Sequence, residues 1–388
     1  MTNQASTTLV SPATFVISAR AAELKALGHP VLSLSIGEPD FPTPDHIKAG
    51  AKAAIDEDVS HYTPTGGLPV LKQAVIDKYK RDYNLDYTME EVVCGAGGKQ
   101  MLFNFFEIML EPGDEVALTD PAWLSYEEQI KWAEGVPLRV PTQPEAMFNM
   151  TAAALASVIT DKTKVVLLNS PGNPTGGIIP EEELKKIIEI CEEKELIILS
   201  DDVYEFFYYE EAPAHVLRLK PELKERVVIV NSVSKTYAMT GWRLGFATGP
   251  EAIIKKMQQR QSLSTSNPCS IAQMAAVSAL NGPHEEVEKM RLAFAKRRDL
   301  AAKKLNEHGQ IPFVEPTGAF YLLMDVKHLL AEGETDLEFC QRLLEKHYVA
   351  MIPGSVFGEA TKGWIRMSIA SSEAVISEAL DRLFLINQ

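Results

Sequence analysis

The sequence lacks three patterns that would place the chain in a membrane, outside the cell or on nucleic acid. No apolar stretch approaches the roughly 20 residues that a membrane-spanning helix needs. Residues 1–20 show no basic segment followed by an apolar one, so we expect no signal peptide. The 38 Lys and Arg are outnumbered by 53 Asp and Glu, which disfavours nucleic acid as a partner because phosphate binding needs a basic surface.

Cysteine and nucleotide-binding motifs are also scarce. The cysteines, Cys94, Cys191, Cys269 and Cys340, are far apart in the sequence and form neither a CxxC metal pair nor the disulfide framework of a small secreted domain. We therefore expect free thiols, a cytoplasmic location and no metal site. The sequence contains neither a P-loop nor a dinucleotide fingerprint, which disfavours a nucleotide-binding protein.

What is present is the composition of a large globular protein. At 388 residues, with 46% hydrophobic and 23% charged residues, the chain is too long for one ordinary core. Short apolar runs rich in β-branched residues alternate with helical patterns such as 180–194, which predicts right-handed βαβ units and a mostly parallel sheet. The predicted buried strands are 92–94, 116–118, 165–168, 197–199 and 227–230.

The last hundred residues have a different pattern. A long helical stretch, about 285–305, precedes an apolar run at 319–324, a helix near 337–346 and a strand-like 364–369. This composition indicates a smaller α+β domain. We expect residues 45–285 to form the large domain and 286–388 the small one, with residues 1–44 an N-terminal segment that partly returns to the small domain.

Chemically useful residues follow the predicted strands. Open parallel sheets bind ligands at the carboxyl ends of their strands. Lys235 lies just after the strand 227–230, where burial or a nearby cation would lower its pKa and make it a usable amine. Ser232, Ser234 and Arg243 flank it and supply the hydroxyl and guanidinium donors that hold a phosphate. A lone lysine would more often be a solvated loop residue, but these neighbours weaken that interpretation.

Two further strand ends carry polar residues. Asp201 follows the strand 197–199 and would pair with a protonated ring nitrogen, or simply cap a helix, while Tyr204 would reach a phenolic oxygen of the same ring. Asn173 stands in the turn 169–176, whose two prolines and two glycines specify a rigid loop.

The segment after the strand 92–94 is rich in glycine. Gly97, Gly98 and Lys99 lead into a helix, and a glycine loop at a helix N-terminus binds anions because free N–H groups and the helix dipole point the same way. Trp123 follows the next strand and would stack on a planar ring, although a tryptophan there is more often part of the core.

Together these segments resemble the class I/II aminotransferase family of fold-type I pyridoxal-5′-phosphate (PLP) enzymes, close to its aspartate subgroup 1β. The resemblance runs from about residue 11 to the C-terminus. It implies an α/β fold whose large domain has a mostly parallel seven-stranded sheet between helices, beside a smaller α+β domain. The motifs that carry it are SVSKTYAMTGWRLG (232–245), NSPGNPTGG (169–177), SDDVYEFFYY (200–209), SIGEPDFPTP (35–44) and HYTPTGGLPVLKQAV (61–75).

The resemblance assigns roles to the positions that match. Lys235 corresponds to the lysine that carries PLP as a Schiff base and moves the substrate proton, Asp201 to the partner of the pyridinium nitrogen, and Tyr204 to a donor on the 3′-oxygen. The other cofactor-binding positions that it implies are Gly97, Gly98, Lys99, Trp123, Asn173, Ser232, Ser234, Arg243 and Tyr62.

The resemblance also implies the substrates and an assembly. Arg366 matches the arginine that grips the α-carboxylate of the substrate, and Gly37 lies in a segment that lines the same pocket, with Trp123 and Asn173. Tyr62 matches a tyrosine that reaches the phosphate of a neighbouring subunit, which implies a homodimer with shared sites. The expected activity is the transfer of an amino group between an L-amino acid and a 2-oxo acid by a ping-pong mechanism.

Two positions bear on which amino acid is used. Lys99 and Thr14 match residues that hold the distal carboxylate in the aspartate-using branch, which favours aspartate or glutamate. The same pair occurs in members that accept prephenate, and members specific for alanine or aromatic substrates share most other motifs. A PLP-dependent lyase or synthase would keep Lys235, Asp201 and Arg243. A PLP-sensing transcription regulator would add a winged-helix domain and a basic surface, and neither is expected here.

Overall fold

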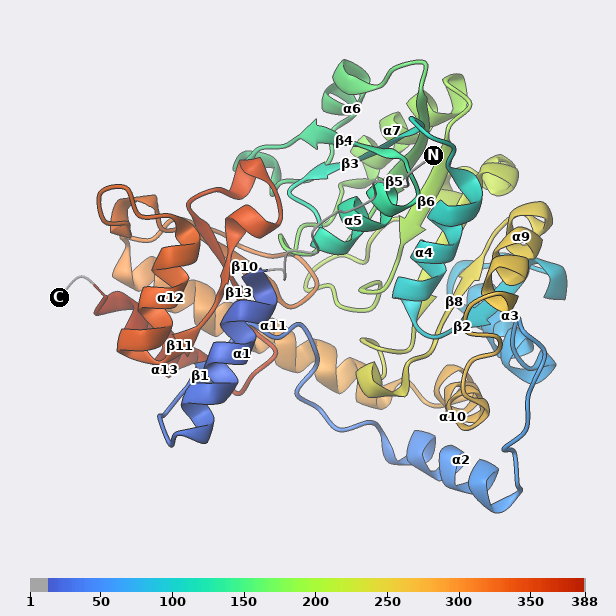
Figure 1. Cartoon of the computed structure of the whole chain (residues 1–388), viewed down its shortest axis with the longest axis horizontal. Helices are drawn as coiled ribbons and strands as arrows, with labels where there is room; N and C mark the ends of the chain where they lie inside the picture. Colours follow the sequence, from blue (N-terminus) through green and yellow to red (C-terminus); the bar gives the residue numbers. More distant parts are fainter. Residues whose placement is uncertain (1–12, 387–388) are drawn as a thin grey trace, which may run out of the picture.

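Residues 13–386 are described by the computed structural model of the chain, and its largest sheet has seven strands (Figure 1). Their order is β2-β8-β7-β6-β5-β3-β4, with β8 antiparallel to both neighbours and the remaining pairs parallel. The predicted α/β fold with a mostly parallel seven-stranded sheet is therefore confirmed. The strands are β2 (Val92–Gly95), β3 (Glu115–Asp120), β4 (Val136–Pro141), β5 (Thr163–Leu168), β6 (Ile197–Asp201), β7 (Val227–Ser232) and β8 (Gly245–Thr248).

Helices cover both faces of this sheet because both faces are apolar. In β5, Val165 and Leu167 join one buried core while Val166 and Leu168 join another, as alternation along a strand requires. The first core includes side chains of α4 (Gly98–Met109), α5 (Leu124–Trp132) and α9 (Glu251–Ser262). The second includes side chains of α2 (Asp45–Asp56), α3 (Pro69–Tyr83), α6 (Ala152–Val158), α7 (Glu181–Glu193), α8 (Val216–Leu219) and α10 (Ser270–Asn281).

Helix α7 shows how the sequence specifies these covering elements. It begins after Pro180 with three glutamates in its first turn, which suit the positive end of the helix dipole. Its buried residues are spaced three and four apart, so one stripe faces the sheet. They are Leu184, Ile187, Ile188 and Cys191.

The C-terminal part builds a separate core with the N-terminal segment. Its four-stranded antiparallel sheet has the order β12-β13-β10-β9, and β1 pairs in parallel with β11. Its strands are β1 (Leu32–Ser33), β9 (Phe313–Val314), β10 (Tyr321–Asp325), β11 (Val349–Ala350), β12 (Ile352–Pro353) and β13 (Trp364–Ser368). Its helices are α1 (Ala13–Ala26), α11 (Glu285–His308), α12 (Asp336–His347) and α13 (Glu373–Phe384).

The helices and strands predicted for the C-terminal part agree closely with the observed ones, except that one strand begins later than predicted. The apolar run at 319–324 becomes a strand only from Tyr321, because Ala319 has a left-handed backbone with φ of 53°. Helix α11 contributes Val287 to the core beneath the large sheet and Phe294 to the C-terminal core, so it connects the two parts. The division of the chain at 44/45 and 285/286 stays a prediction.

Within residues 13–386, no helix is long and apolar enough to span a membrane.

Candidate active site

The carboxyl ends of the central strands bring the predicted residues to one edge of the large sheet. Strand β6 ends at Asp201 and β7 at Ser232, while Asn169 follows the end of β5. These strands are parallel neighbours, so their ends lie side by side. The polar residues after each strand therefore face one common space.

That space is a cavity of about 390 Å³ between the large sheet and the C-terminal part. The size is that of a site for a small organic molecule. The residues predicted from the sequence that line it are Gly37, Gly98, Lys99, Trp123, Asn173, Asp201, Tyr204, Ser232, Ser234, Lys235, Arg243 and Arg366.

Lys235 lies in the cavity wall with its amine directed at the N-terminal segment. Its Nζ donates to the carbonyl oxygen of Gly37 at 2.5 Å. Burial lowers the pKa of Lys235 to about 8, and the nearby Glu38 carboxylate opposes that shift. A lysine with this pKa is partly neutral near physiological pH, and only the neutral amine attacks a carbonyl carbon.

Asp201 is buried and held by a tyrosine. The hydroxyl of Tyr126 donates to Asp201 Oδ2 at 2.6 Å, and the backbone N–H of Val203 donates to Oδ1 at 3.3 Å. Burial raises the pKa of Asp201 to about 6, while the bond from Tyr126 works in the opposite direction. A carboxylate held in this way can stabilise a positive charge placed beside it in the cavity.

Glycine backbone and a guanidinium group converge at the N-terminus of α4. Gly97 precedes the helix with φ of 94°, and a Cβ there would lie 2.7 Å from Arg243 Nη2. A side chain on Gly245 would collide with the backbone nitrogen of Gly98 at 2.3 Å. These glycines leave free N–H groups at a helix N-terminus beside Ser232 and Arg243, which is an arrangement suited to a phosphate.

Arg366 approaches from β13 on the opposite side of the cavity. Its Nη1 donates to Asn173 Oδ1 and its Nη2 to the carbonyl oxygen of Ser35, both at 2.9 Å. The guanidinium carbon lies 4.4 Å from the ring centre of Tyr321 and 5.0 Å from that of Phe357. Within the described chain the buried Nε has no hydrogen-bond partner, and the guanidinium lines the cavity, where it can meet a ligand carboxylate.

Lys99 adds a second cation to the cavity. Its Nζ lies 4.8 Å from the ring centre of Trp123. Among residues 13–386 it forms no ion pair with an acidic side chain, and burial together with the charge of Arg243 lowers its pKa. A cation in the wall of a cavity without an acidic partner favours a negatively charged ligand.

Among the predicted residues whose side chains the structure describes, Gly97 and Tyr62 do not line the cavity. Gly97 lies against the Arg243 guanidinium, since a Cβ there would be 2.7 Å from Nη2. The side chain of Tyr62 is 94% exposed and belongs to the loop between α2 and α3. Thr14 belongs to α1, but its side chain lies outside the part of the chain that the structure describes.

Several residues that line the cavity were not predicted from the sequence, although the motifs around some of them pointed to the site. Tyr126 stands three residues after Trp123 in a P-x-W-x-x-Y motif, and Asn169 directly follows a predicted strand and donates to the Asp201 carbonyl at 2.9 Å. Tyr321, whose hydroxyl lies 2.9 Å from that of Tyr204, appeared only as part of an apolar run. The missed lining residues are Leu102, Leu124, Tyr126, Asn169, Val203, Thr240, Tyr321 and Phe357.

Known proteins are similar to this chain in sequence and fold. The family model for aminotransferase class I and II matches residues 29–383. The aspartate aminotransferase of Geobacillus stearothermophilus is 45% identical over 378 residues, which span 97% of this chain and 96% of that one. A probable aspartate/prephenate aminotransferase of Rickettsia felis is 41% identical over 379 residues, spanning 95% and 92%. The structure of Thermus thermophilus aspartate aminotransferase with maleate has a TM-score of 0.91 at 38% identity and 96% coverage of each chain. The chain therefore belongs to the class I and II aminotransferases, a family of PLP-dependent enzymes.

Proposed function

We propose that this protein transfers an amino group between L-aspartate or L-glutamate and a 2-oxo acid, and that Lys235 is the residue that holds PLP. The observation that carries the proposal is the arrangement of opposite charges in one cavity, with Asp201 beside Lys235 and the cations Lys99, Arg243 and Arg366 around them. An amino acid with two carboxylates and a cofactor with a phosphate need three cationic positions, and the cavity has them.

The residues fit PLP at both ends of the cofactor. The glycine loop at α4, where a Cβ on Gly97 would meet Arg243, leaves room for a phosphate, with Ser232 and Ser234 as hydroxyl donors. Asp201 would hold the proton on the ring nitrogen, and Trp123 would lie against the ring face. PLP, when bound, supplies an electron sink for the charge left on the substrate Cα after its proton is removed.

The chain's own residues would bind the substrate and move that proton. Arg366 would bind the α-carboxylate through its nitrogens, with Asn173 and the Ser35 carbonyl fixing the guanidinium. Nζ of Lys235, whose pKa burial lowers to about 8, would accept the Cα proton and return it to the C4′ carbon of the cofactor.

Lys99 carries the preference for a dicarboxylic substrate. Its ammonium has no acidic partner among the described residues and lines the cavity beside Trp123, so a distal carboxylate would find a free cation there. Prephenate is a second candidate substrate, because it also carries a second carboxylate and several relatives are named probable aspartate/prephenate aminotransferases. Alanine and the aromatic amino acids have no second carboxylate for the Lys99 ammonium to bind.

The substrate preference is tested with Lys99→Met, which keeps the apolar stem and removes the charge. We expect kcat/KM for aspartate to fall about 100-fold, because one charge-assisted contact is lost, and kcat/KM for alanine to change less than about threefold. An equal fall in kcat/KM for aspartate and for alanine would show that Lys99 binds the cofactor phosphate instead. A wild-type enzyme that prefers alanine or phenylalanine would refute the dicarboxylic reading.

We also propose a homodimer in which Tyr62 contributes to the partner's site. The support is the 94% exposure of this tyrosine, which is unusual for a large aromatic side chain. The cytoplasmic location stays a prediction.

A further inference from the structure

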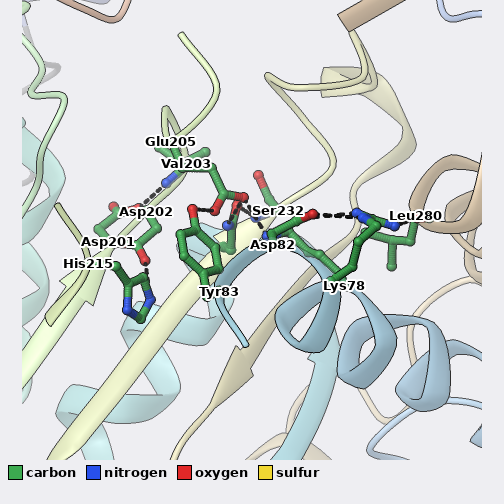
Figure 2. A network of polar contacts seen from close by, with 12 residues as sticks. Lys78, Asp82, Tyr83, Asp201, Asp202, Val203, Glu205, His215, Ser232 and Leu280 are labelled. Carbon is green, nitrogen blue, oxygen red and sulfur yellow. Dashed lines mark hydrogen bonds and ion pairs between the residues drawn. The ribbon is translucent and has the colours of Figure 1, made fainter. Parts of the chain in front are cut away.

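The turn that follows β6 presents different residues on its two sides. Asp201 and Tyr204 line the cavity, whereas their neighbours Asp202 and Glu205 point away from it into a buried polar network (Figure 2). The other members of this network are Lys78, Asp82, Tyr83, Ser200, His215 and Asn231. None of these other residues lines the cavity.

Glu205 is the centre of the network. Its Oε1 lies 2.8 Å from Lys78 Nζ of α3 and accepts a hydrogen bond from Asn231 Nδ2 at 2.7 Å, and its Oε2 accepts one from the Tyr83 hydroxyl. Glu205 is 4% exposed and Lys78 is 1% exposed. Asp82, at 3.4 Å from Lys78 Nζ, is a second and more distant acidic partner. A buried pair of this kind is costly to break because the remaining charge has no water around it.

Asn231 extends the network to the cavity. While its Nδ2 donates to Glu205, its Oδ1 accepts the backbone N–H of Ser232 at 2.7 Å. Ser232 is the next residue of β7 and points to the opposite side, into the cavity. A continuous chain of contacts therefore runs from α3 through Glu205 to the end of β7.

Asp202 fixes the same turn at a second point. Its backbone N–H donates to the carbonyl of Val230 at 2.9 Å, and the hydroxyl of Ser200 donates to its Oδ1 at 2.5 Å. His215 Nδ1 accepts the N–H of Leu217, and burial lowers the pKa of His215 to about 3, so the neutral ring has its proton on Nε2. That nitrogen lies 3.6 Å from Asp202 Oδ2.

We propose that Glu205, Lys78 and Asn231 are positioning residues for the aminotransferase reaction. They hold residues 201–205 and the end of β7 on the side that faces away from the cavity. Asp201, Tyr204 and Ser232 are thereby positioned to contact the cofactor. Because Asp201 ends β6 and Glu205 lies in the turn directly after it, a loss of the anchor at Glu205 moves the Asp201 carboxylate on the cavity side. This inference rests on the proposed function of Lys235 and Asp201.

The test compares Glu205→Gln with the double variant Lys78→Met/Glu205→Gln. The single variant leaves a buried lysine without its near partner, whereas the double variant removes both charges. Glu334→Gln is the matched control, because Glu334 also pairs with a basic side chain, Arg342 at 2.7 Å, but lies in the C-terminal part and does not line the cavity. Three quantities are measured for each purified protein: the Kd for PLP, the pH midpoint of the visible absorption band, and the thermal midpoint without PLP.

We expect Glu205→Gln to raise the Kd for PLP about tenfold, because the residues that meet the cofactor are displaced. The pH midpoint of the band should rise by about half a unit, since a displaced Asp201 holds less positive charge on the ring and the nitrogen of Lys235 bonded to it becomes more basic. The double variant should regain thermal stability and keep both shifts. Glu334→Gln should change neither the Kd nor the midpoint.

A network that serves only as a scaffold gives a different result. The thermal midpoint would fall in Glu205→Gln while the Kd and the pH midpoint stayed at their wild-type values, and this would overturn the inference. If the single variant does not fold, the double variant alone decides between these outcomes. Absence of any band in the wild-type protein with added PLP would instead refute the proposed role of Lys235.

Discussion

Arg366 and Asn173 join the two larger sheets of the molecule. Arg366 belongs to β13 of the four-stranded sheet, and its Nη1 donates at 2.9 Å to Oδ1 of Asn173, in the loop after β5 of the seven-stranded sheet. The Nη2 of the same guanidinium donates to Ser35 in the N-terminal segment. Three separate segments therefore fix one cation in the wall of the cavity.

The first prediction concerns this arginine. Arg366→Lys keeps the charge but removes the planar fork, so it cannot bind Asn173, Ser35 and a carboxylate together. We expect KM for the amino acid to rise about 100-fold with a smaller loss in kcat, measured by steady-state kinetics. Arg342→Lys, in the C-terminal part and away from the cavity, is the control. An unchanged KM would show that another group binds the α-carboxylate.

The second prediction concerns stability and pH. Burial, followed by the nearby Glu205 carboxylate, raises the pKa of Asp202 from 3.8 to about 7 in the folded protein. Between these pH values the folded state binds more protons than the unfolded state, so ionisation of Asp202 lowers stability as pH rises. The free energy of unfolding of Asp202→Asn, relative to wild type, should therefore increase between about pH 4 and about pH 8.

Chemical denaturation of the cofactor-free proteins at several pH values measures this difference. Asp161→Asn, at an exposed position, is the control for the same chemical change on the surface. A difference for Asp202→Asn that falls with rising pH would mean that the Asp202 carboxylate is stabilised in its ionised form.

The third prediction concerns Tyr62 and the partner subunit. Tyr62→Ala and Lys235→Ala should each be nearly inactive as pure proteins. When the two are unfolded and refolded together, each mixed dimer would have one site with both residues, because Tyr62 would come from one subunit and Lys235 from the other. We expect about a quarter of the wild-type activity to return, since random pairing makes half of the dimers mixed. No recovery, with dimers present by light scattering, would place Tyr62 in the site of its own chain or outside any site.

Five of the seven strands of the large sheet and the residues at their ends were predicted from the sequence because they depend on local patterns, whereas β4 and β8 were not predicted. The apolar run 227–230 predicts β7, and the residues just after it lie in the cavity as the rule for parallel sheets requires. Lys99 and Trp123 stand after two other strands, and the structure shows the contact between them at 4.8 Å. Gly37 and Arg366 were expected in the pocket only from the family resemblance.

Other features could not be predicted because they depend on how distant segments pack. Tyr321 and Phe357 lie in apolar segments typical of core strands and loops, and only the folding of the C-terminal part, where β10 pairs with β13, places their rings beside Arg366. The pair of Lys78 and Glu205 joins residues 127 positions apart, and a lysine in an amphipathic helix is normally expected on the exposed side. Nothing in the local sequence indicates that this one is buried.

The most direct test of the account is the absorption spectrum of the purified protein with PLP, beside that of Lys235→Ala. We predict a visible band for wild type that L-aspartate removes, as the cofactor accepts the amino group, and that L-alanine removes much more slowly. Lys235→Ala should bind PLP without forming the band that changes with pH in the wild type. A variant with the wild-type band and its pH dependence, or a wild type with no band after PLP is added, would contradict the central role of Lys235.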